Sequence, residues 1–222
     1  MTDGTGTVEA LEVRVTAPVA SFRDPLYAGV QAGLPCPSPA TIAGMLASAA
    51  GGWDRMPRGT SFGATFTALG AGTDLETYHP LDAQGRKTEL VPKHRAFLAG
   101  ITLTLWLTED LDLWEAAVRR PVWPLRLGRS QDLAAARARR VELVRRVGKQ
   151  GCAITPEKLS RTGVLLRLPT AVSTDRARTR WDAYRYAANG TGNEIPAGLA
   201  TADGQAVPLI SDVHPAALSE PA

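Results

Sequence analysis

Residues 97–107 read FLAGITLTLWL and contain the clearest strand pattern in the chain. From 101 to 107, isoleucine or leucine occupies every second position, which is the period of a strand with one buried face. Residues 109–119 then place apolar side chains on one helical face and acidic ones at the amino end, where the helix dipole favours them. Trp106 and Trp114 fall within these segments, and we interpret both as core residues.

The chain upstream of this strand supplies partners for a sheet. Residues 8–22 and 61–71 both alternate apolar with polar side chains and predict strands. Between them, Ser38 and Pro39 predict the start of a helix, because a serine hydroxyl can accept a bond from a free backbone N–H and proline is tolerated at the first position. We expect this helix to end at Gly51.

Two turn-rich segments interrupt the regular pattern. Residues 72–86 are polar, so we expect a projecting hairpin with its tip at 85–87 and a returning strand over 87–91. Residues 124–130 predict a short strand that enters a tight glycine turn.

The carboxyl-terminal third is harder to assign. Alanine and arginine favour a helix over 134–147, whereas its valines and leucine suit a strand, and propensity alone favours the helix. A strand is expected over 164–168, ended by Pro169. Residues 170–222 have weak periodicity and predict irregular structure.

The order of these elements predicts the fold class. A strand, helix, strand, hairpin, strand, helix and strand follow one another, which is the β-α-β-β-α-β order of an α+β, ferredoxin-like domain with an insertion. We expect one domain over 1–170 and an irregular carboxyl-terminal extension over 171–222 that packs on it, because no linker divides the chain.

The charge is distributed unevenly. The net charge is only +3, but 119–185 holds 17 basic and 5 acidic residues, a net of +12. Of the 25 basic residues in the chain, 21 are arginines, whose planar fork suits phosphate recognition. Aromatic residues that could stack on RNA bases lie in or beside this segment, namely Trp123, Trp181, Tyr184 and Tyr186. The alternative is that arginine simply replaces lysine throughout and these rings are core.

Several classes of protein are excluded by the motifs. His79, His94 and His214 never fall at metal-ligand spacing, and no HExxH, GxSxG or phosphate-loop motif occurs. Cys36 and Cys152 give no zinc pattern, and we expect them to be buried in a reducing compartment. Without an 18-residue apolar run or a signal-like start, we expect a cytoplasmic protein.

Four motifs resemble those of a known family: ASFR at 20–23, PSPATIAGMLASAAG at 37–51, HRAFL at 94–98 and LGRSQDL at 127–133. In this order and in a chain of this length, they are similar to the CRISPR-associated Cas five (Cas5) family of type I Cascade complexes. The resemblance extends over about 8–168 and is nearest to subtypes I-B and I-A.

The resemblance implies a fold and a function. It implies an RRM-like domain of the RAMP superfamily over 1–170, with 72–93 as a β-hairpin thumb that wedges against the guide, and it implies that 141–147 is a strand. Such a subunit caps the 5′ handle of the CRISPR RNA (crRNA). It contacts the backbone subunit (Cas seven) and the large subunit (Cas eight), and reaches target DNA indirectly through the complex. No cofactor, metal ion or membrane is implied.

The same resemblance points to RNA-binding residues. The amino end of the helix at 38–50 suits a phosphate, Gly128 allows close approach of the backbone, and nearby cations line the groove. The candidate RNA-binding residues are Arg23, Ser38, Thr41, Lys93, Arg95, Arg126, Gly128, Arg129 and Ser130. For each cation, the alternative is a surface ion pair.

Catalysis is the point on which the alternatives differ. A metal-independent ribonuclease needs a base, an acid and a cation, and Tyr78, His79, Lys93 and His94 offer these types. In subtype I-C the homologous subunit cleaves repeat RNA with such side chains, but no matching trio can be aligned here. We therefore expect a non-catalytic RNA-binding subunit. The alternatives are a repeat-processing endoribonuclease and a generic RRM-like protein that binds cellular RNA.

Overall fold

The computed structural model describes residues 6–24, 33–78, 81–82, 84–86, 89 and 91–218, apart from the side chains of Tyr78 and Val91. Two α-helices and ten strands are found in these residues. They are β1 (Thr7–Ala20), α1 (Pro39–Ala50), β2 (Gly63–Thr67), β3 (Gly70–Tyr78), β4 (Val91–Leu107), α2 (Leu111–Arg119), β5 (Ala135–Val144), β6 (Gly148–Lys149), β7 (Thr155–Pro156), β8 (Val164–Val172), β9 (Thr179–Tyr186) and β10 (Glu194–Ile195). Short 3₁₀ turns occupy Trp53–Arg55, Glu157–Leu159 and Pro215–Leu218.

The central sheet has the strand order β2-β4-β1-β5, and every pair in it is antiparallel. The alternation predicted for 101–107 sets its register, because Leu103 and Leu105 stand opposite Val15 and Val13 of β1, and all four are buried. These side chains share one face of the sheet, which we call the inner face, and the alternate residues form the outer face. The mixed α and β structure that we expected from the sequence is therefore confirmed, and the strand pairs are antiparallel.

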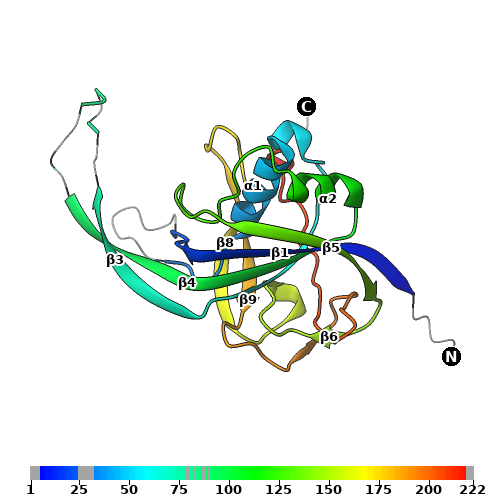
Figure 1. The fold of residues 1–222 in the computed structure, drawn as a ribbon. Helices are drawn as coiled ribbons and strands as arrows, with labels where there is room; N and C mark the ends of the chain where they lie inside the picture. Colours follow the sequence, from blue (N-terminus) through cyan, green and yellow to red (C-terminus); the bar gives the residue numbers. More distant parts are fainter. Residues whose placement is uncertain are drawn as a thin grey trace.

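A two-stranded ribbon extends from the central sheet. β3 pairs with the first half of β4, from Gly70 opposite Ala99 to Tyr78 opposite Val91, and Figure 1 shows this pair projecting away from the rest of the molecule. Beyond it, the carboxylate of Asp82 accepts backbone N–H bonds from Gln84 and Arg86. This turn agrees with the predicted hairpin tip, of which residue 87 lies outside the described residues.

Both helices pack on the inner face of the central sheet. Ser38 caps α1 as predicted, since its Oγ accepts the N–H of Thr41 at 3.2 Å, and Gly51 ends the helix with φ of +101°. Ile42 and Leu46 of α1 join Trp114 of α2 in the buried core against the sheet. The expected burial of Trp106 and Trp114 is confirmed, although Trp106 lies on the opposite face in a smaller cluster.

The helix that propensity favours over 134–147 is wrong. The strand that the resemblance implied over 141–147 is present in part, because β5 covers Ala135–Val144 and residues 145–147 lie in no strand. β5 pairs with β1 over ten consecutive residue pairs, from Thr7 opposite Val144 to Thr16 opposite Ala135. This pairing gives the backbone of β5 its hydrogen bonds, and Ala136 and Ala138 pack against the core. Tertiary pairing has overridden the local preference of alanine and arginine.

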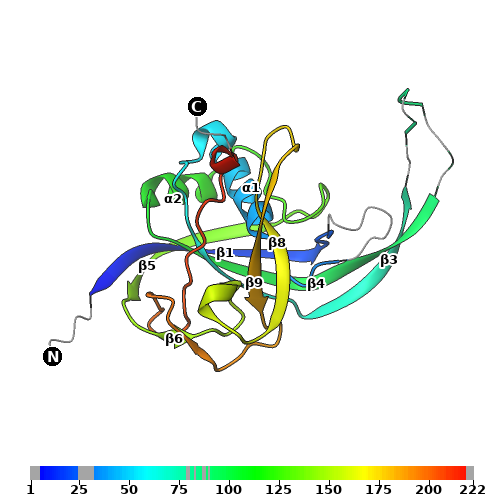
Figure 2. The ribbon, with the colours of Figure 1, turned by 180° about the vertical axis from the view of Figure 1, so that it is seen from behind.

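The irregular structure expected after residue 170 is also wrong in part. β8 continues past Pro169 to Val172 with a register shift at the proline, and β9 pairs with it to form the sheet β7-β9-β8. Figure 1 shows β8 and β9 behind β1 and β4, and Figure 2 shows them in front. Tyr184 and Tyr186 are buried on β9, so the expectation that they stack on RNA bases is wrong.

The two cysteines differ in environment. Cys36 is fully buried, and desolvation raises the pKa of its thiol well above the ordinary value, so the thiol stays protonated at neutral pH. Cys152 is half-buried and also has a raised pKa, for the same reason. In the part of the chain that the structure describes, no helix is long and apolar enough to cross a membrane.

Tyr186 tests whether the chain after residue 170 belongs to the same cooperative unit. Its ring packs in the main core near Phe66, and its hydroxyl donates to the Phe66 carbonyl at 3.0 Å. We expect Tyr186→Ala to lower the free energy of unfolding by about 3–5 kcal/mol in a single transition measured with urea. Leu165→Ala, at a 47%-exposed position of β8, is the control and should cost far less. A separate early transition in Tyr186→Ala would contradict a shared core.

Candidate nucleic-acid interface

A pocket of about 260 Å³ lies where β1 ends and α1 begins. Four of the nine residues predicted from the sequence meet here, although they are up to 105 positions apart in the chain. Its lining includes Arg23, Ser38, Thr41 and Gly128. Trp53, Pro169 and Val172 complete one wall. The pocket therefore combines a cation, hydroxyls, a helix amino end and apolar surface.

The amino end of α1 contributes positive potential to this pocket. Ser38 is buried, and its Oγ lies 2.9 Å from Thr41 Oγ1, so the two hydroxyls bond to each other as well as capping the helix. Ala40 also lines the pocket within the first turn. Because the helix dipole and free backbone N–H groups favour anions at this end, the position suits a phosphate.

Gly128 brings the loop after α2 close to the end of β1. This glycine has φ of +110°, and a Cβ added to it would lie 2.8 Å from the Ser21 carbonyl oxygen. A bridge between Arg126 and Leu133 closes the loop, and the N–H of Leu127 donates to the Asp132 carbonyl at 3.0 Å. The tight glycine turn predicted here is confirmed, and only a residue without a side chain fits it.

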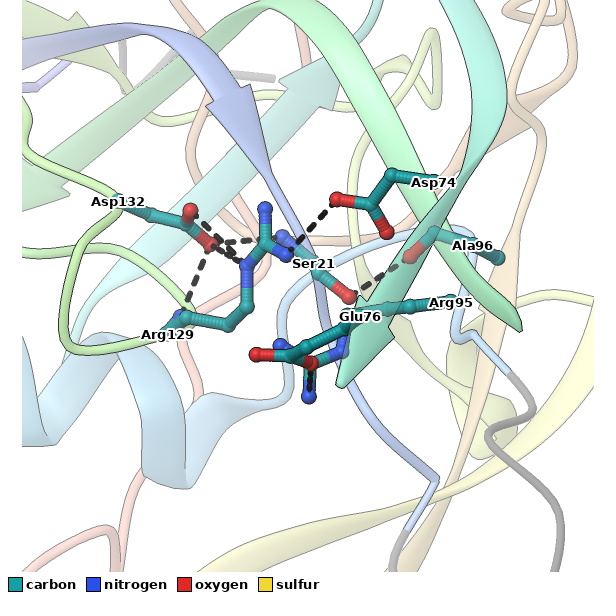
Figure 3. A network of polar contacts seen from close by, with 7 residues as sticks. All are labelled: Ser21, Asp74, Glu76, Arg95, Ala96, Arg129 and Asp132. Carbon is teal, nitrogen blue, oxygen red and sulfur yellow. Dashed lines mark hydrogen bonds and ion pairs between the residues drawn. The ribbon is translucent and has the colours of Figure 1, made fainter. Parts of the chain in front are cut away.

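Asp132 fixes the loop to the sheet, as Figure 3 shows. Its carboxylate is 3% exposed, and its Oδ2 accepts backbone N–H bonds from Ser21 at 3.0 Å and from Arg129 at 2.9 Å. The Arg129 side chain donates back to Asp132 through Nε and reaches Asp74 Oδ2 at 3.2 Å. One carboxylate therefore joins β1, the Gly128 loop and, through Arg129, the ribbon.

The ribbon carries a second ion pair beside this network. Arg95 of β4 pairs with Glu76 of β3, and Asp74 lies directly across from Arg95 in the strand register. Burial, with the nearby positive charge of Arg129, lowers the pKa of the Arg95 guanidinium. Asp74 Oδ1 is buried without a hydrogen-bond partner. These groups hold the base of the ribbon against the Gly128 loop.

The predicted site residues thus fall into three groups. Arg23, Ser38, Thr41 and Gly128 line the pocket. Arg129 and Arg95 are 15% and 19% exposed and take part in ion pairs that are largely buried. Arg126 and Ser130 are exposed on the Gly128 loop, and Lys93 lies on the ribbon, outside the pocket lining.

Sequence reasoning missed the residues that position this site. Asp132 lies within the LGRSQDL motif, and its spacing of three from Arg129 is the signal that could have suggested an ion pair. Trp53 follows the helix stop at Gly51 and joins the pocket wall. Asp74 gave no local signal, because its partner Arg129 is 55 positions away.

A second, more apolar cavity of about 210 Å³ adjoins the pocket. It lies between the end of β1 and the base of the ribbon, and it shares Ser21, Phe22 and Leu34 with the first pocket. Ala71, Gly72 and Phe97 complete its apolar wall. Within the described residues, no group of three or more histidine, cysteine, aspartate or glutamate side chains could hold a metal ion.

Comparison with known proteins gives one family match and several structural matches. The model of the family described as CRISPR-associated protein (Cas_Cas5) matches residues 10–197. A chain of a CRISPR RNA-guided surveillance complex is 20% identical with a TM-score of 0.56, over 82% of this chain and 90% of that chain. No curated protein sequence matches.

A second structural match comes from a different kind of complex. A chain of a Type III-B Cmr-beta complex bound to cognate target RNA and AMPPnP is 11% identical with a TM-score of 0.52, over 83% of this chain and 85% of that chain. At these identities the two structures establish the similarity of the fold alone.

The close approach at Gly128 gives a test of the loop. We expect Gly128→Ala to lower the free energy of unfolding by at least about 2 kcal/mol, because it adds a steric overlap with Ser21 to the strain of a positive φ. Gly198→Ala is the control, since Gly198 also has a positive φ but an added Cβ there meets nothing within 4 Å. Equal losses for the two variants, measured by urea unfolding, would show that the contact with β1 is unimportant.

Proposed function

This chain belongs to the CRISPR-associated Cas5 family, whose model covers residues 10–197, and we propose that it is a non-catalytic subunit of a CRISPR effector complex that caps the 5′ handle of the crRNA. The observation that carries this proposal is the pocket in which the amino end of α1, Arg23 and Gly128 converge. In the proposal, a handle phosphate occupies the helix amino end, and the cations beside it engage neighbouring phosphates.

The arrangement of the strands supports a ferredoxin-like, RAMP-type assignment. α1 follows β1, α2 follows β4, and β5 closes the sheet order β2-β4-β1-β5. This is the β-α-β-β-α-β succession with β3 and the ribbon inserted before the third of the four core strands. In the proposal, the ribbon is the thumb that contacts the guide.

The ion pairs at the base of the ribbon support this role. Arg129 links Asp74 on β3 to Asp132 in the Gly128 loop, so the ribbon and the pocket are held in a fixed relation. An RNA strand that entered the pocket would pass the adjoining apolar cavity, which is lined by Gly72 and Phe97. The proposed partners are the crRNA handle, the backbone subunit and the large subunit, with target DNA reached through the complex.

The geometry of the ribbon favours a non-catalytic role over the endoribonuclease alternative. Lys93 and His94 are consecutive in β4, opposite Glu76 and Leu75, so their side chains leave opposite faces of the ribbon. They cannot act on one phosphodiester group together without rearrangement. His79 lies outside the described residues.

Arg126 offers the most direct test of RNA binding. Its side chain is exposed on the Gly128 loop, so its replacement leaves the Arg129 network in place. We expect Arg126→Glu to weaken binding to repeat-handle RNA and to reduce the slope of log K against log salt by about 1. Arg161→Glu, which removes an 87%-exposed guanidinium remote in sequence, is the control. Equal effects of the two reversals would remove Arg126 from the interface.

Incubation with repeat RNA tests the absence of catalysis. We expect the purified protein to leave repeat RNA intact in the presence of a chelator, with no difference between wild type and His94→Ala. Metal-independent cleavage that His94→Ala abolishes would establish the endoribonuclease alternative instead. Co-purification of a crRNA with a multi-subunit particle separates both readings from a generic RNA-binding protein.

A further inference from the structure

The outer face of the central sheet carries a polar surface away from the pocket. The inner-face residues are Leu11, Val13 and Val15, so the alternate residues of β1 point the other way. Two rows of side chains cross the four strands on this outer face. The first row is Thr65, Thr104, Arg14 and Arg137, and the second is Thr67, Thr102, Thr16 and Ala135.

Two arginines stand directly opposite each other in the first row. Arg14 of β1 pairs with Arg137 of β5 in the strand register, and both are exposed. Side chains at such positions have Cβ atoms about 4.5–5.5 Å apart, and like charges there are destabilising. Within the described residues, neither guanidinium has an ion pair. The pair is therefore a concentrated positive charge without an internal counterion.

Glu12 lies on the same face, two positions from Arg14 in β1, and its carboxylate is already engaged. Glu12 accepts Arg139 Nε at 2.6 Å through one oxygen and Trp106 Nε1 at 3.3 Å through the other. On the inner face, by contrast, Arg140 is neutralised by ion pairs with Glu9, Asp112 and Glu115. The chain thus neutralises Arg139 and Arg140 but leaves Arg14 and Arg137 for an external anion.

The chemistry of the surrounding surface indicates which anion fits. Threonine hydroxyls flank the arginine pair on three strands and can donate to phosphate oxygens. The two rows contain no aromatic ring, and Trp106 in the next row is buried beneath Leu199 and Val207. Single-stranded nucleic acids are bound largely by stacking on exposed rings. A duplex instead presents phosphates outward and turns its bases inward, so it complements this face.

We propose that Arg14 and Arg137, with Thr16 and Thr104, form a second nucleic-acid site that holds the phosphate backbone of a double-stranded nucleic acid without reading its bases. In this proposal, the phosphates of the duplex act as counterions for Arg14 and Arg137, which form no ion pair within the described residues. This site lies on the outer face of the sheet and shares no residue with the pocket at Gly128, so it stands or falls independently of handle capping.

The test is duplex binding by the full chain at several salt concentrations. The probe is a fluorescent 20-base-pair DNA duplex of arbitrary sequence, followed by anisotropy. We expect the double variant Arg14→Gln/Arg137→Gln to bind about tenfold more weakly at low salt and to lower the salt slope by about 2. Arg161→Gln/Arg178→Gln removes two exposed charges elsewhere and should change neither quantity comparably.

Two further measurements separate the site from general charge effects. Without nucleic acid, Arg137→Gln should raise Tm by about 1–4 °C, because it relieves the repulsion from Arg14. Handle RNA binding should be unchanged in the double variant and reduced in Arg126→Glu. An unchanged Tm, equal duplex losses in the two double variants, or an equal loss of binding to a single-stranded 20-mer would overturn the assignment. So would duplex binding by Arg14→Gln/Arg137→Gln that equals binding by the wild type.

Discussion

The buried carboxylate of Asp132 is the contact on which the candidate site depends. Burying a charge is costly unless it is fully hydrogen-bonded, and this one accepts backbone N–H groups of Ser21 and Arg129 and the Arg129 side chain. It thereby holds the end of β1, the Gly128 loop and the ribbon together, as Figure 3 shows. The first two of these segments line the pocket together with the amino end of α1, and the ribbon lines the adjoining apolar cavity.

Part of the positive charge in this protein is paired with carboxylates of the same chain. Six arginines of the basic segment at 119–185 form ion pairs with carboxylates, namely Arg129, Arg139, Arg140, Arg161, Arg180 and Arg185. The net of +12 for this segment therefore overstates the charge that a partner would meet. It is more informative to ask which guanidinium groups have no carboxylate nearby. The strand register is needed to identify them.

Local patterns predicted well those elements whose signals are contained within them. The cap at Ser38, the stop at Gly51 and the alternation in β4 are each encoded within a few residues, and all are present. Local propensity predicted the wrong structure at Pro169, where a strand end was expected, and over β5, where a helix was favoured. At both places strand pairing supplied the hydrogen bonds that decided the conformation. The burial of Tyr184 and Tyr186 depends on a sheet that local periodicity did not indicate.

By itself, the sequence determined the succession of strands and helices as far as α2, the glycine turn at Gly128 and the family, because these rest on short-range sterics, capping and contiguous motifs. Only the tertiary structure decided that Arg23, Ser38, Thr41 and Gly128 share one pocket, while Arg129 and Arg95 are held in ion pairs. It also placed Arg14 opposite Arg137. Contacts across more than a hundred residues depend on strand order and register, which no local signal contains.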